Sequence, residues 1–313
     1  MIGFDIGGTK CAVSVGYEQN GELIIKDKQT VPQDLSVSPY EMIDRLAALA
    51  ETMTDDFSSI GISCGGPLDS RAGVILSPPN LRGWDNVNIV EHLKKRYGGK
   101  VSLQNDANAC AIAEWRYGAG RGTQSMIFLT FGTGMGAGLI LDGRLYAGAS
   151  DMAGEIGHVR MSEYGPVGYG KRGSFEGFCS GNGIAQIGQT LATEQLQQGR
   201  TVSYCRSADE LPLITAKKIA EFANAGHEDA KQVFTLCGER LGAGLSILID
   251  VLNPEAIVIG SVFLRCEHLL RGAMTRVIER ETLSHARRVC RILPAGLGEQ
   301  IGDYAALSVA AQQ

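Results

Sequence analysis

The sequence predicts an α/β protein of two lobes with a cleft between them. Segments rich in β-branched residues alternate with segments of helical periodicity along the 313 residues, which is typical of largely buried sheets covered by helices. A chain of this length can bury two hydrophobic cores. A strand, a glycine-rich turn and a second strand also follow one another twice, at the N-terminus and near residue 132. This repeat favours two related lobes that each present a hairpin to a shared ligand.

The first 117 residues are expected to hold four strands and two helices. A serine and a proline precede the apolar stripe of the first helix, as at many helix starts. Two buried-type strands end on polar or glycine-rich turns, Gly65-Gly66-Pro67 and Gln104-Asn105-Asp106. The predicted elements are two strands within Ile2–Val15, a helix at Pro39–Met53 capped by Ser38, strands at Ser59–Ser63 and Val101–Leu103, and an alanine-rich helix at Ala107–Tyr117.

The rest of the chain repeats the strand and helix alternation. Apolar residues at helical spacing predict one long helix that ends before Pro254. The predicted elements are strands at Met126–Phe131 and Leu139–Leu141, a glycine-rich loop at Gly165–Gly173, a polar connection at Gln195–Leu213, a helix at Asp229–Leu252, a strand at Ala256–Gly260 and a closing helix at Tyr304–Ala311.

Composition excludes several classes of function. The net charge of -5 gives no basic footprint for nucleic acid or an anionic membrane. Charged and polar residues interrupt the most apolar stretch, Leu245–Phe263, so no membrane span is predicted. Ile2 enters a strand-like stretch without the features of a signal peptide, which predicts a cytoplasmic protein. The eight cysteines stand singly, without a Cys-x-x-Cys pair, and are expected to be reduced.

The two glycine turns, Gly7–Lys10 and Gly132–Gly138, are candidate phosphate sites. Glycines let successive N–H groups face phosphate oxygens, while Thr9 and Thr133 add hydroxyl donors. One such turn alone is typical of an ordinary tight hairpin, whereas two in one chain favour phosphate binding. A Walker loop is excluded, because no Gly-Lys-Ser/Thr ends a suitable run. The spacing of Gly132, Gly134 and Ala137 matches a dinucleotide fingerprint, but a strand rather than a helix is predicted after it.

Three carboxylates and a histidine are candidate catalytic or sugar-binding groups. Asp106 follows a strand and precedes a helix; it could accept a hydroxyl proton, cap the helix, or do both. Glu155 and His158 lie three residues apart between glycines, and Glu176 follows the glycine-rich loop. A carboxylate and an imidazole suit sugar hydroxyls. A zinc site, or a capping and ion-pairing role, is the alternative for Glu155 and His158.

Four motifs in this order resemble the ROK family, named for its repressors, open reading frames and kinases. The resemblance covers nearly the whole chain and implies an actin-like ATPase (ribonuclease H-like) fold. It implies a smaller lobe of residues 1–107 plus about 296–313 and a larger lobe of 108–295. The motifs are Asp5-Ile6-Gly7-Gly8-Thr9-Lys10, Asn105-Asp106-Ala107-Asn108-Ala109, Phe131-Gly132-Thr133-Gly134-Met135-Gly136-Ala137-Gly138 and Gly154-Glu155-Ile156-Gly157-His158.

Position by position, the resemblance also implies roles for single residues. Asp106 matches the base that takes the proton of the sugar hydroxyl. Residues matching the contacts to the phosphates and magnesium of ATP are Asp5, Gly7, Gly8, Thr9, Lys10, Gly132, Thr133 and Gly134, with Gly260 bordering adenosine. Residues matching the sugar contacts are Asn80, Asn105, Asp106, Glu155, His158 and Glu176, with Gly66 close by.

One departure from the family concerns its zinc motif. The three cysteine ligands of the motif Cys-x-Cys-Gly-x-x-Gly-Cys-x-Glu are replaced here by Val167, Tyr169 and Ser174. His158, the fourth ligand in the family, could not hold zinc alone. We therefore predict no structural zinc, and a loop stabilised instead by packing of Val167, Tyr169 and Phe175.

The resulting prediction is an ATP:sugar phosphotransferase of the glucokinase type. It would use ATP and Mg²⁺ to phosphorylate a hexose, with the 6-hydroxyl of glucose or a close relative as the default. An N-acetylmannosamine or N-acetylglucosamine kinase and a fructokinase are alternatives. A sugar-sensing regulator is the alternative of another class, but the first hairpin begins at Asp5 and leaves no room before it for a helix-turn-helix. We also expect a homodimer without nucleic-acid or membrane partners.

Overall fold

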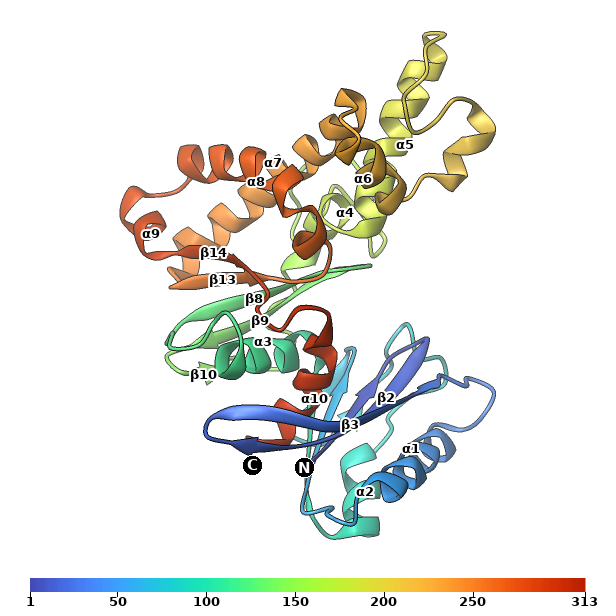
Figure 1. Cartoon of the computed structure of the whole chain (residues 1–313), viewed down its shortest axis with the longest axis vertical. Helices are drawn as coiled ribbons and strands as arrows, with labels where there is room; N and C mark the ends of the chain where they lie inside the picture. The colour runs from blue at the N-terminus through green and yellow to red at the C-terminus, as the bar shows by residue number, and fades with distance from the viewer. Residues whose placement is uncertain (313) are drawn as a thin grey trace. The chain divides into compact units, whose positions relative to one another are not determined.

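The chain forms two compact units in the computed structural model, which describes residues 1–312 (Figure 1). Unit 1 consists of Met1–Phe128, Gly138–Gly154 and the residues from 296 onward. Unit 2 consists of Leu129–Ala137 and Glu155–Ala295. The predicted lobe boundary near residue 107 was defined by a nucleotide-binding cleft, whereas these units are defined by compactness. The boundary therefore stays a prediction.

A five-stranded sheet in the order β3-β2-β1-β4-β7 organises unit 1. Strand β1 pairs antiparallel with β2, as the predicted hairpin requires, and parallel with β4, which pairs parallel with β7. Because β1, β4 and β7 are parallel, their carboxyl ends share one edge, and the turns after them lie together there. The strands are β1 Ile2–Ile6, β2 Lys10–Gln19, β3 Glu22–Pro32, β4 Ser59–Cys64 and β7 Lys100–Asn105.

Helices cover both faces of the unit 1 sheet (Figure 1). On one face, α1 (Pro39–Met53) and α2 (Ile89–Tyr97) pack on Ile2, Phe4 and Ile6 to form the main core. On the other, α10 (Ile301–Ala310) lies on Gly3 and Gly61, where an added Cβ would come within 2.9 Å and 2.2 Å of the helix. Successive strand residues face opposite sides, so Asp5 lies on the α10 face.

Helix α3 (Asp106–Tyr117) leaves the end of β7 and packs against α10. Short strands complete unit 1 at β5 (Leu68–Asp69), β6 (Val74–Ile75) and β10 (Arg144–Leu145). The predicted helix at Pro39–Met53 and its Ser38 cap are confirmed, since the Ser38 side chain accepts from the Glu41 N–H. The closing helix is also confirmed, although it begins three residues earlier than predicted, at Ile301.

The second sheet has the order β10-β9-β8-β13-β14. Strands β8 (Met126–Phe131) and β9 (Met135–Leu141) form the second predicted hairpin, and each crosses the division between the units. Strands β13 (Ala256–Ile259) and β14 (Arg291–Pro294) pair in parallel. The turn between β8 and β9 leads into a strand rather than a helix, which agrees with discarding the dinucleotide fingerprint.

Unit 2 is largely helical (Figure 1). Its longest helices, α7 and α8, pack closely where Gly238 and Gly242 of α7 face the backbone of α8; an added Cβ would lie 2.7 Å and 2.5 Å from α8 carbonyl oxygens. The helices and short strands of unit 2 are η1 Ile156–His158, β11 Val167–Gly168, β12 Lys171–Arg172, α4 Phe175–Phe178, α5 Gly181–Gln197, η2 Ala208–Leu213, α6 Ala216–Asn224, α7 Glu228–Leu252, α8 Val262–Glu281 and α9 Ser284–Val289. The short helix η3 (Gly298–Gln300) belongs to unit 1.

The cysteines are all free, and six of the eight are buried. Within residues 1–312, none of the helices combines the length and the apolar character that crossing a bilayer needs.

Candidate active site

The first glycine hairpin forms a tight turn at the shared strand edge of unit 1. The Gly7 N–H donates to the Lys10 carbonyl oxygen over 3.2 Å. Gly8 lies against the loop that carries Asn80, because an added Cβ would come within 2.5 Å of the Asn80 carbonyl oxygen. The Thr9 and Lys10 side chains are exposed. The turn therefore presents a hydroxyl and a cation to solvent, with its backbone fixed.

Asp5 is a strongly perturbed carboxyl group of this edge. Burial raises its pKa to about 7, and the negative charges of Asp106 and Asp303 act in the same direction, while Lys28 and Lys10 oppose them. Lys28 itself is paired, with its Nζ 2.6 Å from Oδ1 of Asp303. Three carboxylates near one strand end repel one another, so this edge is suited to a cation.

Asp106 is the first residue of α3, but it is not the residue that caps the helix. The Asn105 Oδ1 accepts from the N–H groups of Ala107 and Asn108, at 2.9 Å and 3.4 Å. The alternative that Asp106 caps the helix is therefore wrong, because the cap is the residue before it, Asn105. Asp106 Oδ1 accepts from the Ala107 N–H over 2.8 Å. Desolvation raises the pKa of Asp106, and this hydrogen bond opposes the rise. Asp106 is exposed at the surface, so the desolvation is partial.

Unit 1 thus brings together most of the residues predicted in its part of the chain. Gly66 lies beside the Asn105 amide, where an added Cβ would be 3.2 Å from Nδ2. At Gly65, an added Cβ would lie 4.0 Å from Oδ2 of Asp106. The two glycines leave room next to a carboxylate and an amide, which is the space a hydroxylated ligand would need.

The second glycine hairpin, in unit 2, is tied to Glu176. The Met135 N–H donates to Oε2 of Glu176 over 3.1 Å, and an added Cβ on Gly134 would lie 2.8 Å from the same oxygen. The Gly132 carbonyl oxygen accepts from the Gly181 N–H at the start of α5 over 2.8 Å. The Thr133 side chain is exposed at the turn. The structure therefore joins a predicted phosphate turn to a predicted sugar residue, a contact that sequence reasoning missed.

Glu155 precedes the short helix η1, and His158 is its last residue. Gly157 lies against β9, since an added Cβ would be 2.0 Å from the Met135 carbonyl oxygen. The His158 ring is exposed and meets the Tyr169 ring edge-on, with centroids 6.3 Å apart. Unit 2 thus places η1 and Glu176 next to each other beside Met135, with Gly157 at its carbonyl oxygen and the Glu176 carboxylate at its N–H.

The glycine-rich loop is not stabilised as predicted. Phe175 is fully buried, but the Val167 and Tyr169 side chains are 42% and 72% exposed, so the predicted packing of these two is wrong. Hydrogen bonds hold the loop instead. They include backbone bonds such as the Gly173 N–H to the Pro166 carbonyl oxygen, and two bonds between the Gln186 side chain and the backbone of Val167. Among the described residues no cluster of three His, Cys, Asp or Glu side chains could hold a metal, so the residues present do not fit the family's zinc site.

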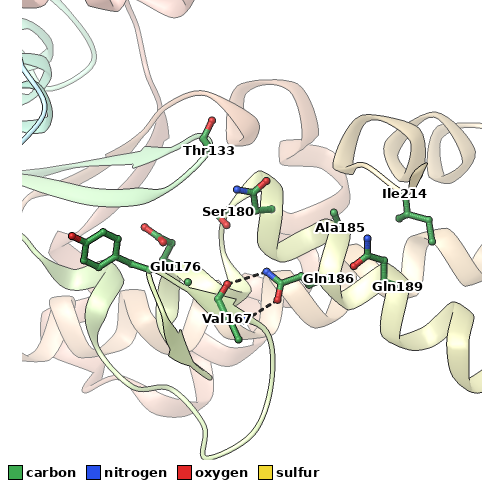
Figure 2. Close-up of a pocket in the computed structure, with 11 residues that line it drawn as sticks. Thr133, Val167, Glu176, Ser180, Ala185, Gln186, Gln189 and Ile214 are labelled. Carbon is green, nitrogen blue, oxygen red and sulfur yellow. Dashed lines mark hydrogen bonds between the residues drawn. The ribbon is translucent and has the colours of Figure 1, made fainter. Parts of the chain in front are cut away.

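Two adjoining cavities of unit 2 share Thr133 and Asn182. The smaller, about 370 Å³, lies between the glycine-rich loop and α5, with Glu176, Thr133 and Gln186 on its wall (Figure 2). The larger, about 850 Å³, extends past Ser261 to α6 and α8, where Lys217 and Arg265 line it. Ser261 directly follows the predicted adenosine residue Gly260. No sequence pattern pointed to Asn182 or Lys217, because neither belongs to any of the motifs.

The strand orders and the hairpins at both strand edges define an α/β protein of the actin-like ATPase fold. The chain belongs to the ROK family, which it matches over residues 1–313. It is 28% identical to a glucokinase of Thermotoga maritima over 99% of this chain and 96% of that protein. It is 33% identical to an N-acetylmannosamine kinase of Citrobacter koseri over 60% and 64% of the two chains. A ROK family glucokinase from Streptomyces griseus, solved in complex with glucose and AMPPNP, superimposes with a TM-score of 0.77 at 29% identity, covering 100% and 99% of the two chains.

Proposed function

We propose that this protein is an ATP-dependent hexose kinase, with the 6-hydroxyl of glucose or a close relative as the acceptor. The observation that carries the proposal is the edge of unit 1, where a carboxylate at a helix start, Asp106, lies with a glycine-threonine hairpin and a second carboxylate, Asp5. The glucose and AMPPNP named for the Streptomyces griseus relative are a sugar and an ATP analogue, which supports the same pair of ligands here.

Asp106 is the proposed general base. Its carboxylate accepts the proton of the sugar hydroxyl while the hydroxyl oxygen bonds to the γ-phosphorus of ATP. The bond from that phosphorus to the bridging oxygen breaks, and ADP leaves. The Ala107 N–H that donates to Oδ1 leaves Oδ2 to take the proton. The raised pKa of Asp106 makes it a stronger base than an ordinary aspartate, which suits this role.

The phosphate and magnesium contacts are proposed for both glycine hairpins. In unit 1 they are the Gly7, Gly8 and Thr9 turn with Lys10, and in unit 2 the Gly132, Thr133 and Gly134 turn. Magnesium supplies charge neutralisation between the phosphates, and the crowding of negative charge around Asp5 fits a cation there. The larger cavity of unit 2, which begins beside Gly132 and passes Ser261, is proposed for the nucleoside, with Gly260 at its border.

The sugar contacts are proposed for Asn80, Asn105, Asp106, Glu155, His158 and Glu176, with Gly66 leaving space. Amide, carboxylate and imidazole groups together offer the donors and acceptors that hydroxyls require. The Citrobacter koseri relative keeps an N-acetylmannosamine kinase open as the second candidate. A homodimer, a cytoplasmic location and the lack of structural zinc also belong to this proposal.

A coupled assay of ADP release tests the function. It would compare glucose, mannose, fructose, N-acetylglucosamine and N-acetylmannosamine at equal concentrations with Mg-ATP. We expect turnover that depends on the sugar, highest with glucose. Highest turnover with N-acetylmannosamine would select the second candidate. Sugar binding by calorimetry without turnover on any sugar would instead favour a sensor and contradict the kinase proposal.

A further inference from the structure

The Gln186 side chain binds both backbone groups of one residue in the glycine-rich loop. The Val167 N–H donates to Gln186 Oε1 over 2.9 Å, and Gln186 Nε2 donates to the Val167 carbonyl oxygen over 2.9 Å (Figure 2). Val167 starts β11, which pairs, within residues 1–312, with the two-residue strand β12 alone. A strand edge presents unpaired N–H and C=O groups, and the amide of Gln186 satisfies them as a neighbouring peptide group would.

The next residue of β11 connects this clamp to Glu176. An added Cβ on Gly168 would lie 2.5 Å from the Gly177 nitrogen and 2.9 Å from the Glu176 Cβ, so β11 rests directly on the start of α4. Ser174 caps that helix, because its Oγ accepts from the Gly177 N–H over 3.1 Å. The backbone that carries Glu176 is therefore held from one side by the cap and from the other by β11.

Glu176 in turn holds the phosphate turn. Its Oε2 accepts from the Met135 N–H, directly after Gly132-Thr133-Gly134. A series of direct contacts thus runs from Gln186 through Val167 and Gly168 to Glu176 and the Met135 amide. Ordering a glutamate side chain costs rotamer entropy. Glu176 therefore keeps this hydrogen bond more easily when its backbone is already held in place.

We propose that Gln186 is a positioning residue: it fixes β11 on α4 and thereby holds Glu176 against the Met135 amide of the second glycine hairpin. The expected effect of Gln186 on kinetics rests on the proposed kinase function, in which Glu176 binds the sugar and the hairpin binds phosphate. The expected effect of Gln186 on the structure of the loop is independent of that function.

The test compares Gln186→Met with Gln195→Met in the full-length protein. Methionine keeps the length of Gln186 and removes both hydrogen bonds. Gln195 lies on the same helix and accepts from Arg200 Nε over 2.7 Å, so its substitution also removes a side-chain bond but leaves the loop untouched. Hydrogen exchange without ligands is the first measurement. Backbone amides of residues 165–175 and of Met135 should exchange about tenfold faster in Gln186→Met, as expected for the loss of one or two exposed hydrogen bonds. In Gln195→Met, the exchange of these amides should not change.

Kinetics are the second measurement. The KM for the sugar should rise about tenfold in Gln186→Met, with kcat within about threefold of the wild type, because loosening Glu176 costs ground-state binding. Gln186→Glu can still accept from the Val167 N–H but turns a carboxylate to the Val167 carbonyl, and should behave like Gln186→Met. Wild-type behaviour of Gln186→Met, which lacks both hydrogen bonds, would show that shape alone holds β11 and would overturn the proposal.

The two proposals can fail separately. Faster exchange at residues 165–175 with an unchanged Met135 amide would overturn the connection to the phosphate turn. Unchanged exchange at both places would overturn the clamp. If the wild-type protein phosphorylates no sugar, hydrogen exchange still decides the role of Gln186, and only the kinase function is lost.

Discussion

Asp5 combines a proposed role at the phosphate site with a charge that folding disfavours. A carboxyl group whose pKa rises from 3.8 to about 7 on folding binds its proton more tightly in the folded state. Its stabilising contribution is therefore complete below pH 4 and is lost as the pH rises through about 7. The charged form is tolerated at neutral pH because a cation can offset it.

Replacing Asp5 by asparagine should remove this pH dependence. We expect Asp5→Asn to unfold with a free energy on the order of 1 to 2 kcal/mol higher than the wild type at pH 8, since solvent reduces the full cost of about 1.4 kcal/mol per pKa unit. Urea unfolding at pH 5 and pH 8 measures it, with Asp55→Asn as the control for removing an exposed carboxylate. Equal stability of Asp5→Asn and wild type at pH 8 would contradict the burial argument.

Asp106 should govern turnover rather than sugar binding. Asparagine keeps the size of the side chain and cannot take a proton, so kcat should fall by about 10² to 10⁴ in Asp106→Asn, while the Kd for the sugar stays within about threefold. In the wild type, turnover should decline on acidification at a pH above the ordinary aspartate pKa, because desolvation raises the pKa of Asp106. Steady-state kinetics and calorimetry measure both, and near-normal kcat in the variant would refute the assignment.

At the scale of single elements, helix starts separate stability from activity. Ser38 and Asn105 cap α1 and α3 through side-chain oxygens, and loss of either cap should lower stability by about 1 kcal/mol. Only Asn105 lies beside the proposed sugar contacts. Asn105→Ala should therefore also raise the KM for the sugar, whereas Ser38→Ala should leave it unchanged. Equal kinetic effects of both variants would remove Asn105 from the sugar site.

The contact of α10 with the unit 1 sheet depends on two glycines. A methyl group at Gly61 would come within 2.2 Å of the Ala306 carbonyl oxygen and 2.3 Å of the Ala310 nitrogen. Backbone cannot yield as a flexible side chain does, so Gly61→Ala should destabilise by at least about 1 to 3 kcal/mol. Gly272→Ala is the matched control, because its nearest neighbour is the end of the Arg276 side chain at 3.8 Å, and it should stabilise α8 by about 0.5 to 1 kcal/mol. Thermal unfolding compares them, and a neutral Gly61→Ala would contradict the packing.

Local signals explain which elements were predictable. Helix α1 was predicted to the residue, because its signals are local: Ser38 directly precedes it, and Pro39 and the apolar stripe lie within it. The glycine-rich loop was not, because the side chain that holds it, Gln186, stands 19 residues away. Likewise, the motifs identified Glu176 and the second glycine hairpin separately, but only the fold shows that they are bonded. Spacing along the chain carries no information about such long-range contacts.

For the molecule as a whole, the clearest expectation concerns metals. Purified protein should contain less than about 0.1 zinc per chain, because zinc needs about four thiolate, imidazole or carboxylate ligands. A zinc chelator should not change the midpoint of thermal unfolding. Elemental analysis and melting curves with and without the chelator measure this, with the free thiols reduced throughout. One zinc per chain would overturn the zinc-free loop.

Saturating sugar should stabilise the protein against heat. At a concentration of 100 times its Kd, a ligand that binds only the folded state adds about 2.7 kcal/mol to the free energy of unfolding. The order of stabilisation among sugars should match the order of turnover. Stabilisation by a sugar that is not phosphorylated would identify an inhibitor or a sensed ligand.

The position of α10 on β1 and β4 also bears on synthesis in the cell. The sheet that carries Asp5 is made from residues near the start of the chain, yet one of its faces is covered by residues 301–310. The ribosome must therefore translate all of unit 2 before α10 can pack on the unit 1 sheet. Until then, one face of that sheet is exposed to solvent. Termination of translation at residue 300, before α10, would leave that face uncovered and release a chain prone to aggregation.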